Sequence, residues 1–419
     1  KSQLGGNPAG LRERITLSGQ VDALRSLTQK GTVILVPTHS SNLDSIVLGY
    51  ALFSLNLPPF TYGAGKNLFS NFLISYFMNN LGAYKVDRRL RHGLYKDTLK
   101  SYSTVILERG YHSLFFPGGG RARSGELEKK LKLGLLGTGL AAYINNLRAG
   151  KANPKVFVVP ATLNYPLVLE AATLMDDHLK SIGKSRYIIE DDEFTKLGRL
   201  RAYMHAILQF EGRMFIQIGQ ALDPFGNRVD AEGNSLDMRG RPIDTSKYVE
   251  LGGEPRHDAK RDAEFTRELG NEIVTAFYRN NVILTTHAVA FALYELLREA
   301  HPNLDVYHLI RLPADTALPI TTVLEAIARL RDRLVIEMAA GRIHMSPTVQ
   351  SESVERILAV ALDYFRMYHL KPLAQREGDR ILLSDIKLLL YYRNRLTGYN
   401  LEGLFAPETA QTGAQWANV

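Results

Sequence analysis

Residues 33–45, which read VILVPTHSSNLDS, decide the fold of this chain. The first four residues are all apolar, a run that suits a buried strand and is too short for a helix. Pro37 ends the predicted strand. His39 and Asp44 follow at its carboxyl end, with four residues between them. An imidazole held by a carboxylate at such a place can take a proton from a hydroxyl group.

The same His-x4-Asp spacing occurs twice more, at His92 and Asp97 and at His257 and Asp262. Those two copies lie in charged sequence, RRLRHGLYKD and PRHDAKRD, and only the first copy follows an apolar strand. We therefore interpret the later copies as surface coincidences. Spacing alone does not identify a site.

The composition of the chain indicates a globular protein and excludes several kinds of site. The chain has 419 residues, 45% hydrophobic and 22% charged, which indicates a folded globular protein with room for more than one domain. The absence of cysteine excludes disulfides, thiolate metal sites and a cysteine nucleophile. The histidines are scattered, so we predict no metal site and no cofactor.

The chain is basic, with a net charge of +8. A positive charge favours binding to nucleic acid, to an anionic membrane surface or to a phosphorylated substrate. We predict no nucleic-acid partner, because no known nucleic-acid motif is present. No apolar run reaches the roughly 18 residues of a spanning helix. Residues 68–81 are predicted as a helix in the core or one lying flat on a membrane, and the core is the better expectation.

Short apolar runs alternate with helical patterns, which predicts an α/β fold with a mostly parallel central sheet flanked by helices. The predicted strands are 32–36, 60–66, 82–89, 113–116, 155–160 and 213–218.

Residues 223–262 are rich in Gly, Pro and charge and predict a long loop or insertion. From residue 263 onward the pattern is helical. We therefore predict an α/β domain over 1–280 and an all-helical C-terminal region over 281–419. Helices are expected near 263–280, at the end of the α/β domain, and near 282–299, 320–340, 351–369 and 384–395 in the C-terminal region.

A Gly-Arg loop, PGGGRARSG, follows the predicted strand 113–116. Its glycines let the backbone approach a ligand, and Arg121 and Arg123 can each hold a phosphate. In a parallel sheet this loop lies at the same edge as His39, where α/β folds bind ligands. The simpler interpretation is a flexible turn with exposed arginines.

Further cations, Lys66 and Arg88, lie where predicted strands end, and each taken alone is typical of a solvated surface. Two competing motifs fail. The GAGKN sequence lacks the first Gly and the final Ser or Thr of a phosphate-binding loop, and no G-x-S-x-G elbow is present.

Four segments, in order, resemble the conserved blocks of the glycerolipid acyltransferase superfamily. They are VPTHSSNLDS, GAGKNL followed by GAYKVDRR, FFPGGGRARSG and FVVPATLNY. The second and third blocks look most like the glycerol-3-phosphate acyltransferase branch. The blocks cover about residues 33–165.

The resemblance implies transfer of an acyl group from acyl-CoA or an acyl-acyl-carrier protein to the sn-1 hydroxyl of glycerol 3-phosphate, giving lysophosphatidate for phospholipid synthesis. His39 would be the general base, Asp44 would orient it, and attack would be direct, within a ternary complex. The expected phosphate ligands are Lys66, Arg88, Gly119, Gly120 and Arg121, and further motif positions are Asn67, Arg123, Ser124 and Pro160. We also expect peripheral association with an anionic membrane at the cytoplasmic face, a hypothesis that rests on residues 68–81.

Two positions depart from the family pattern. Gly118 stands where an acidic residue is usual, and Ser40 stands where the branch usually has Arg. Three explanations stay open: the missing carboxylate comes from elsewhere, the acceptor differs, or activity is weak. The alternatives for function are an acyltransferase for dihydroxyacetone phosphate or lysophosphatidate, and a non-catalytic basic lipid-binding protein.

Overall fold

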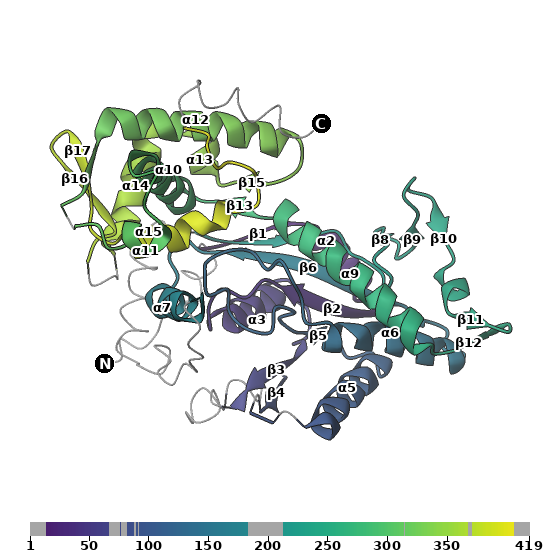
Figure 1. The fold of residues 1–419 in the computed structure, drawn as a ribbon. Coiled ribbons are helices and arrows are strands. Elements are labelled where there is room, and N and C mark those ends of the chain that lie inside the picture. Colours follow the sequence, from purple (N-terminus) through teal and green to yellow (C-terminus); the bar gives the residue numbers. More distant parts are fainter. Residues whose placement is uncertain are drawn as a thin grey trace, which may run out of the picture.

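A seven-stranded sheet forms the centre of the molecule (Figure 1). The computed structural model describes residues 14–66, 76, 82–87, 89–90, 92–182, 213–313, 315–367 and 371–405. The strands are β1 (Ile15–Gly19), β2 (Thr32–Pro37), β3 (Thr61–Gly65), β4 (Ala83–Val86), β5 (Ser113–Leu114), β6 (Val156–Asn164) and β7 (Met214–Ile218). Their order is β1-β7-β6-β2-β5-β3-β4. Only β6 and β7 pair antiparallel among these neighbours, so the predicted mostly parallel sheet is confirmed.

Strand β2 lies in the middle of the sheet and is buried along its whole length. Its side chains alternate between two cores, with Val33 and Leu35 in one and Ile34 and Val36 in the other. Alternation follows from the two-residue period of a strand, and burial on both faces explains the unbroken apolar run.

Helices cover both faces of the sheet. On one face α2 (Val21–Leu27) and α3 (Asp44–Ser54) contribute to the first core. On the other face α5 (Gly93–Glu108), α6 (Leu133–Arg148) and α9 (Ala259–Arg279) contribute to the second core (Figure 1). This layered arrangement places the carboxyl ends of β2 and β5 at one edge of the sheet.

Residues 223–255, predicted as an irregular loop, contain short paired strands. They are β8 (Arg228–Val229), β9 (Ser235–Leu236), β10 (Pro242–Ile243), β11 (Glu250–Leu251) and β12 (Glu254–Pro255). Three turns in this segment share the pattern Asp-x-x-Gly. In each turn the Asp carboxylate accepts the backbone N–H four residues later, and the Gly has a positive φ; the turns begin at Asp223, Asp230 and Asp237. The segment therefore has a seven-residue repeat that was not predicted.

The C-terminal region is predominantly helical, as predicted. Helix α10 (Thr285–Ala300) is buried along nearly its whole length and packs against its neighbours on several sides. An all-round apolar helix of this kind is a core helix. The others are α11 (Val306–Leu309), α12 (Ile320–Ala339), α13 (Pro347–Ser351), α14 (Val354–Arg366) and α15 (Ile386–Arg393). Within the described ranges, no helix is long and apolar enough to cross a membrane.

Short strands accompany these helices, although none was predicted there. Strands β13 (Val282–Ile283) and β15 (His344–Met345) pair with each other, and β14 (Ala317–Pro319), β17 (Arg380–Leu383) and β16 (Ala374–Glu377) form a small sheet. Their residues alternate with polar ones or are too few to form a recognisable apolar run.

The C-terminal region packs directly on the Gly-Arg loop. Gly125 has a φ of +81°, and a Cβ there would lie 2.1 Å from the backbone oxygen of Tyr391 in α15. The Asn394 side chain donates to the Ser124 carbonyl at 2.9 Å. The first core is also continuous across both regions. The predicted boundary near residue 280 therefore does not separate the site from the C-terminal helices.

Candidate active site

His39 and Asp44 form a buried pair at the carboxyl end of β2. His39 Nδ1 lies 2.8 Å from Asp44 Oδ2, and the carboxylate is fully buried. The same oxygen accepts the backbone N–H groups of Ser40, at 2.7 Å, and Ser41, at 3.0 Å. The Tyr165 hydroxyl donates to the other oxygen at 2.6 Å. Because an ionised carboxylate only accepts, Nδ1 carries the proton and Nε2 is left as the basic nitrogen.

The loop after β5 holds the His39 ring and backbone. Phe116 stacks on the imidazole, with ring centroids 4.0 Å apart and planes 19° apart. The Ala122 N–H donates to the His39 carbonyl at 2.7 Å. The His39 N–H donates to Glu128 Oε1 at 2.9 Å. The imidazole side chain is 10% exposed, so one edge of a well-anchored ring reaches solvent.

Arg121 lies against the loop between His39 and Asp44. Its Nη1 is 3.2 Å from Glu170 Oε1, and the two side chains are 13% and 1% exposed. Glu170 also accepts from the Asn42 N–H at 3.0 Å and the Ser41 hydroxyl at 2.9 Å. Burial raises the pKa of Glu170, and the charge of Arg121 opposes that rise. The predicted phosphate ligand Arg121 is therefore brought to the predicted catalytic pair through one buried carboxylate.

The glycines of the loop leave backbone exposed beside this arginine. Gly119 has a φ of +72°, and a Cβ there would lie 2.4 Å from Cδ of Lys132. A Cβ at Gly120 would meet nothing within 4 Å, so the backbone faces open space there. Lys132, which was not among the predicted ligands, adds a cation over the loop.

Other predicted ligands lie farther out. Lys66 is exposed and pairs with Asp87 at 3.6 Å, and neither hydrogen bond nor ion pair links it to His39 in the described structure. Arg88 and Asn67 lie outside the described residues, as does the apolar stretch 68–81 apart from Tyr76. Whether they reach the site stays a prediction.

The remaining motif positions have mainly structural contacts. Arg123 is exposed. Ser124 accepts the Asn394 side chain of the C-terminal region through its carbonyl. Pro160 is buried in β6 opposite Val36 of β2, and its carbonyl accepts the Gly219 N–H at 2.8 Å. Pro160 thus lies in the sheet interior, beneath the edge where His39 stands.

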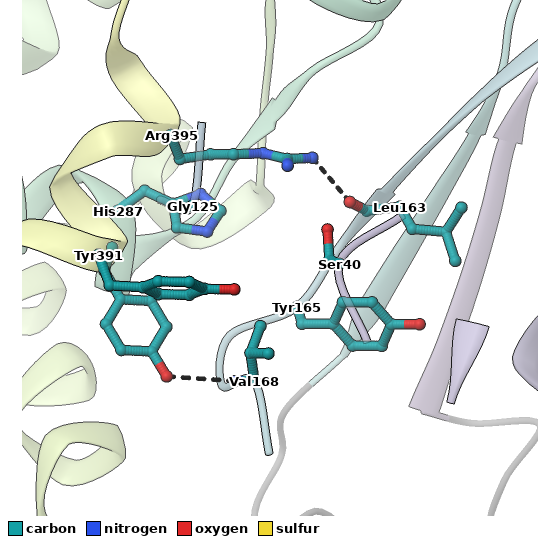
Figure 2. A pocket seen from close by; sticks show the side chains of 9 residues that line it. Ser40, Gly125, Leu163, Tyr165, Val168, His287, Tyr391 and Arg395 are labelled. Carbon is teal, nitrogen blue, oxygen red and sulfur yellow. Dashed lines mark hydrogen bonds between the residues drawn. The ribbon is translucent and has the colours of Figure 1, made fainter. Parts of the chain in front are cut away.

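A small cavity lies on the C-terminal side of the pair (Figure 2). Its volume is about 20 Å³, room for a water molecule and not for a phosphate ester. Ser40 and Tyr165 line it from the α/β domain, and His287 and Arg395 line it from the C-terminal region. Burial lowers the pKa of His287 well below its usual value.

Arg395 is a buried cation that sequence reasoning missed. Its guanidinium donates to the Leu163 carbonyl at 2.7 Å (Figure 2), to Asn164 Oδ1 at 2.7 Å and to Asn281 Oδ1 at 2.9 Å. Burial lowers the pKa of Arg395, and the charge of Glu128 opposes that effect. Arg395 and Ser40 line the same cavity, so the position at which the resemblance implies an arginine lies close to an arginine of the C-terminal region.

Residues 18–164 match the family model described as Acyltransferase. The chain is 31% identical over 182 residues to a glycerol-3-phosphate acyltransferase of Ectopseudomonas mendocina. This match covers 43% of this chain and 21% of the relative. It is also 31% identical over 205 residues to one of Aeromonas hydrophila, covering 48% and 23%. The chain thus spans about a fifth of the length of the curated relatives that it matches.

A solved structure is also similar, the 1-acyl-sn-glycerophosphate (LPA) acyltransferase PlsC from Thermotoga maritima. The match covers 62% of this chain and 70% of that chain, with 14% identity and a TM-score of 0.29. The family match, by contrast, spans β2, the Gly-Arg loop and β6, which are the elements that build the site. The resemblance predicted from the four sequence blocks is therefore confirmed over residues 18–164, which match the Acyltransferase family model.

Proposed function

We propose that the chain transfers an acyl group from a thioester to the sn-1 hydroxyl of glycerol 3-phosphate. The observation that carries this proposal is the His39–Asp44 pair, whose carboxylate is fully buried and held by three further donors. The relatives are glycerol-3-phosphate acyltransferases, which supports this acceptor, although the matched segment is about a fifth of their length.

In this mechanism His39 Nε2 removes the proton of the acceptor hydroxyl as its oxygen attacks the thioester carbonyl. A C–O bond forms, the tetrahedral intermediate collapses, and the C–S bond breaks. The imidazolium returns its proton to the leaving thiolate, so the enzyme ends as it began. Asp44 holds the ring and stabilises the imidazolium while it exists.

Arg121 would hold the acceptor phosphate beside the base. Glu170 offsets part of its charge, so the phosphate needs more than this one cation. Lys132 lies over the same loop and supplies a second positive charge. Lys66 and Arg88 remain proposed contributors from the β3–β4 side. Phosphate binding by several cations fixes the hydroxyl near Nε2 and thereby lowers the entropic cost of the reaction.

The acceptor and donor are testable together. Wild-type chain would be assayed with glycerol 3-phosphate, dihydroxyacetone phosphate and lysophosphatidate, each with acyl-CoA and with acyl-acyl-carrier protein, and products identified by mass spectrometry. We expect 1-acylglycerol 3-phosphate as the main product and none from His39→Ala. A main product from another acceptor would replace the proposed substrate, and undiminished transfer by His39→Ala would remove the mechanism.

We further propose that the chain binds membranes peripherally. Helix α3 begins at the site and exposes Ile46, at 48%, and Phe53, at 75%. Their seven-residue spacing puts both on one side of the helix, where they could contact lipid close to the base. Ile46→Ser with Phe53→Ser should reduce flotation with anionic liposomes. Unchanged flotation would show that this face does not bind the membrane.

A further inference from the structure

Gly118 leaves a space that another residue fills. A Cβ built on Gly118 would lie 2.8 Å from Glu128 Cγ and 3.2 Å from Glu128 Oε1. These distances are too short for both side chains to be present without movement. The Glu128 carboxylate therefore occupies the volume into which a side chain at position 118 would extend.

The loop geometry brings Glu128 back to this place. The Lys132 N–H donates to the Pro117 carbonyl at 2.7 Å, which closes residues 117–132 into one loop. Leu127 is 3% exposed and anchors the loop in the first core. Glu128 follows that anchor and turns inward, whereas its neighbours Lys129 and Lys130 are exposed.

Glu128 contacts the proposed base through the backbone. Its Oε1 accepts the His39 N–H at 2.9 Å, and its Oε2 is buried with no hydrogen-bond partner among the residues that the structure describes. Burial raises the pKa of Glu128, while the His39 N–H and the charge of Arg395 oppose that rise. A buried carboxylate is costly, so its retention here calls for a role.

We propose that Glu128 is a positioning residue of the active site and takes the place of the carboxylate that position 118 lacks. Glu128 accepts the His39 backbone N–H while Asp44 accepts the ring Nδ1–H, so that Nε2 keeps one position at the acceptor. Glu128 touches neither substrate nor the reacting atoms. The inference rests on the proposed function and explains how this chain tolerates Gly118.

The test moves the carboxylate from position 128 to position 118. Glu128→Ala should lower kcat by about 10- to 100-fold, because a displaced base loses its alignment, and should leave the KM for the acceptor within about twofold. The exchange variant Gly118→Glu with Glu128→Ala should regain most of the lost kcat. Gly118→Glu alone should lower the melting temperature, because two carboxylates would compete for one space. Glu126→Ala is the matched control, since Glu126 lies on the same loop in a partly exposed pair with Lys129 at 2.7 Å and should leave kcat unchanged.

The inference is overturned if Glu128→Ala keeps full kcat, or if the exchange variant is neither more active nor more stable than Glu128→Ala. Should Glu128→Ala fail to fold, a folded and active exchange variant still supports the proposal, and an unfolded or inactive one overturns it. If wild-type chain acylates no acceptor, the proposed function fails on that result alone. The melting temperatures of the four combinations at positions 118 and 128 then decide separately whether the two positions share one space.

Discussion

The His-x4-Asp spacing produces a side-chain contact twice in this molecule, in two different settings. His39 Nδ1 lies 2.8 Å from Asp44, and His257 Nδ1 lies 3.4 Å from Asp262. Asp44 is fully buried, whereas Asp262 is 20% exposed. His257 Nε2 lies 2.8 Å from Asn145 Oδ1, while His39 Nε2 makes no hydrogen bond within the described residues. Only the first pair keeps a nitrogen ready for a substrate.

The shared spacing has a shared local cause. In both pairs the Asp lies in the first turn of a helix, α3 or α9, where the helix N-terminus favours a carboxylate, and the His precedes the helix. The difference comes from what packs around them. His39 follows a central strand and meets the Gly-Arg loop, whereas His257 follows an exposed segment. The spacing therefore permits this contact where the Asp lies in the first turn of a helix, which Asp97 of the third copy does not. Tertiary packing then decides whether the contact has a catalytic use.

Neutralising each aspartate should separate the pairs most strongly. Asp44→Asn replaces an acceptor of four hydrogen bonds and should lower kcat by about 10²- to 10⁴-fold, because the imidazole loses its tautomer and its counter-charge. Asp262→Asn should leave kcat within about twofold, because Asp262 pairs with His257 and Arg261 and not with the Gly-Arg loop. Steady-state acyl transfer by both variants measures this. Equal losses would mean that the two pairs do not differ in catalytic use.

Arg121→Ala tests whether phosphate binding distinguishes the first pair. Loss of a charged hydrogen-bond donor should raise the KM for glycerol 3-phosphate by about 10- to 100-fold. Arg261, which bonds to Asp262 at 2.8 Å, is the matched arginine of the second pair, and Arg261→Ala should leave that KM unchanged. An unchanged KM in Arg121→Ala would place the phosphate elsewhere.

Tyr165→Phe removes one donor from the Asp44 carboxylate and keeps the ring. We expect kcat to fall by about tenfold, since a hydrogen bond to a charged group is lost from a buried site. The melting temperature should fall by a few degrees with it. A full-activity variant would show that Ser40 and Ser41 suffice to hold Asp44.

The smallest effect is expected when the hydrogen bond of His257 to Asn145 is removed. Asn145→Ala removes the partner of His257 Nε2. In a His39→Ala background this change should restore no acyl transfer, because the Gly-Arg loop with Arg121 packs against His39 and not against His257. Any gain of activity on adding Asn145→Ala would contradict the importance that we give to the surroundings.

Much of the fold could be predicted from short-range patterns. Strands β2 and β6 contain the continuous apolar runs 33–36 and 156–159, and helices α9, α12 and α14 have clear 3.6-residue periods, so their positions followed from sequence. Strand β1 was missed because its alternating residues 15–18 form a very short pattern and are only partly buried at the sheet edge. The antiparallel direction of β7 depends on how the chain returns from β6, which no local pattern reveals.

The site residues that could be predicted are those that lie in short, recognisable segments of the sequence. His39, Asp44 and Arg121 were found because two short segments contain them. Glu128 reaches the site because the loop 117–132 closes on itself, and Arg395 reaches it because the C-terminal helices pack there. Both effects depend on tertiary contacts, which no local sequence pattern reveals. The Asp-x-x-Gly turns were different, since the seven-residue spacing of Asp223, Asp230 and Asp237 is visible in the printed sequence.

His39 acts as the catalytic base in this account, and His257 does not. The most direct measurement is acyl transfer from a labelled thioester to glycerol 3-phosphate by wild-type chain, His39→Ala and His257→Ala, with folding checked by melting temperature. We predict that His39→Ala loses about 10²- to 10⁴-fold in kcat while His257→Ala matches wild type. Equal activity of the two variants would contradict the assignment of His39 as the base.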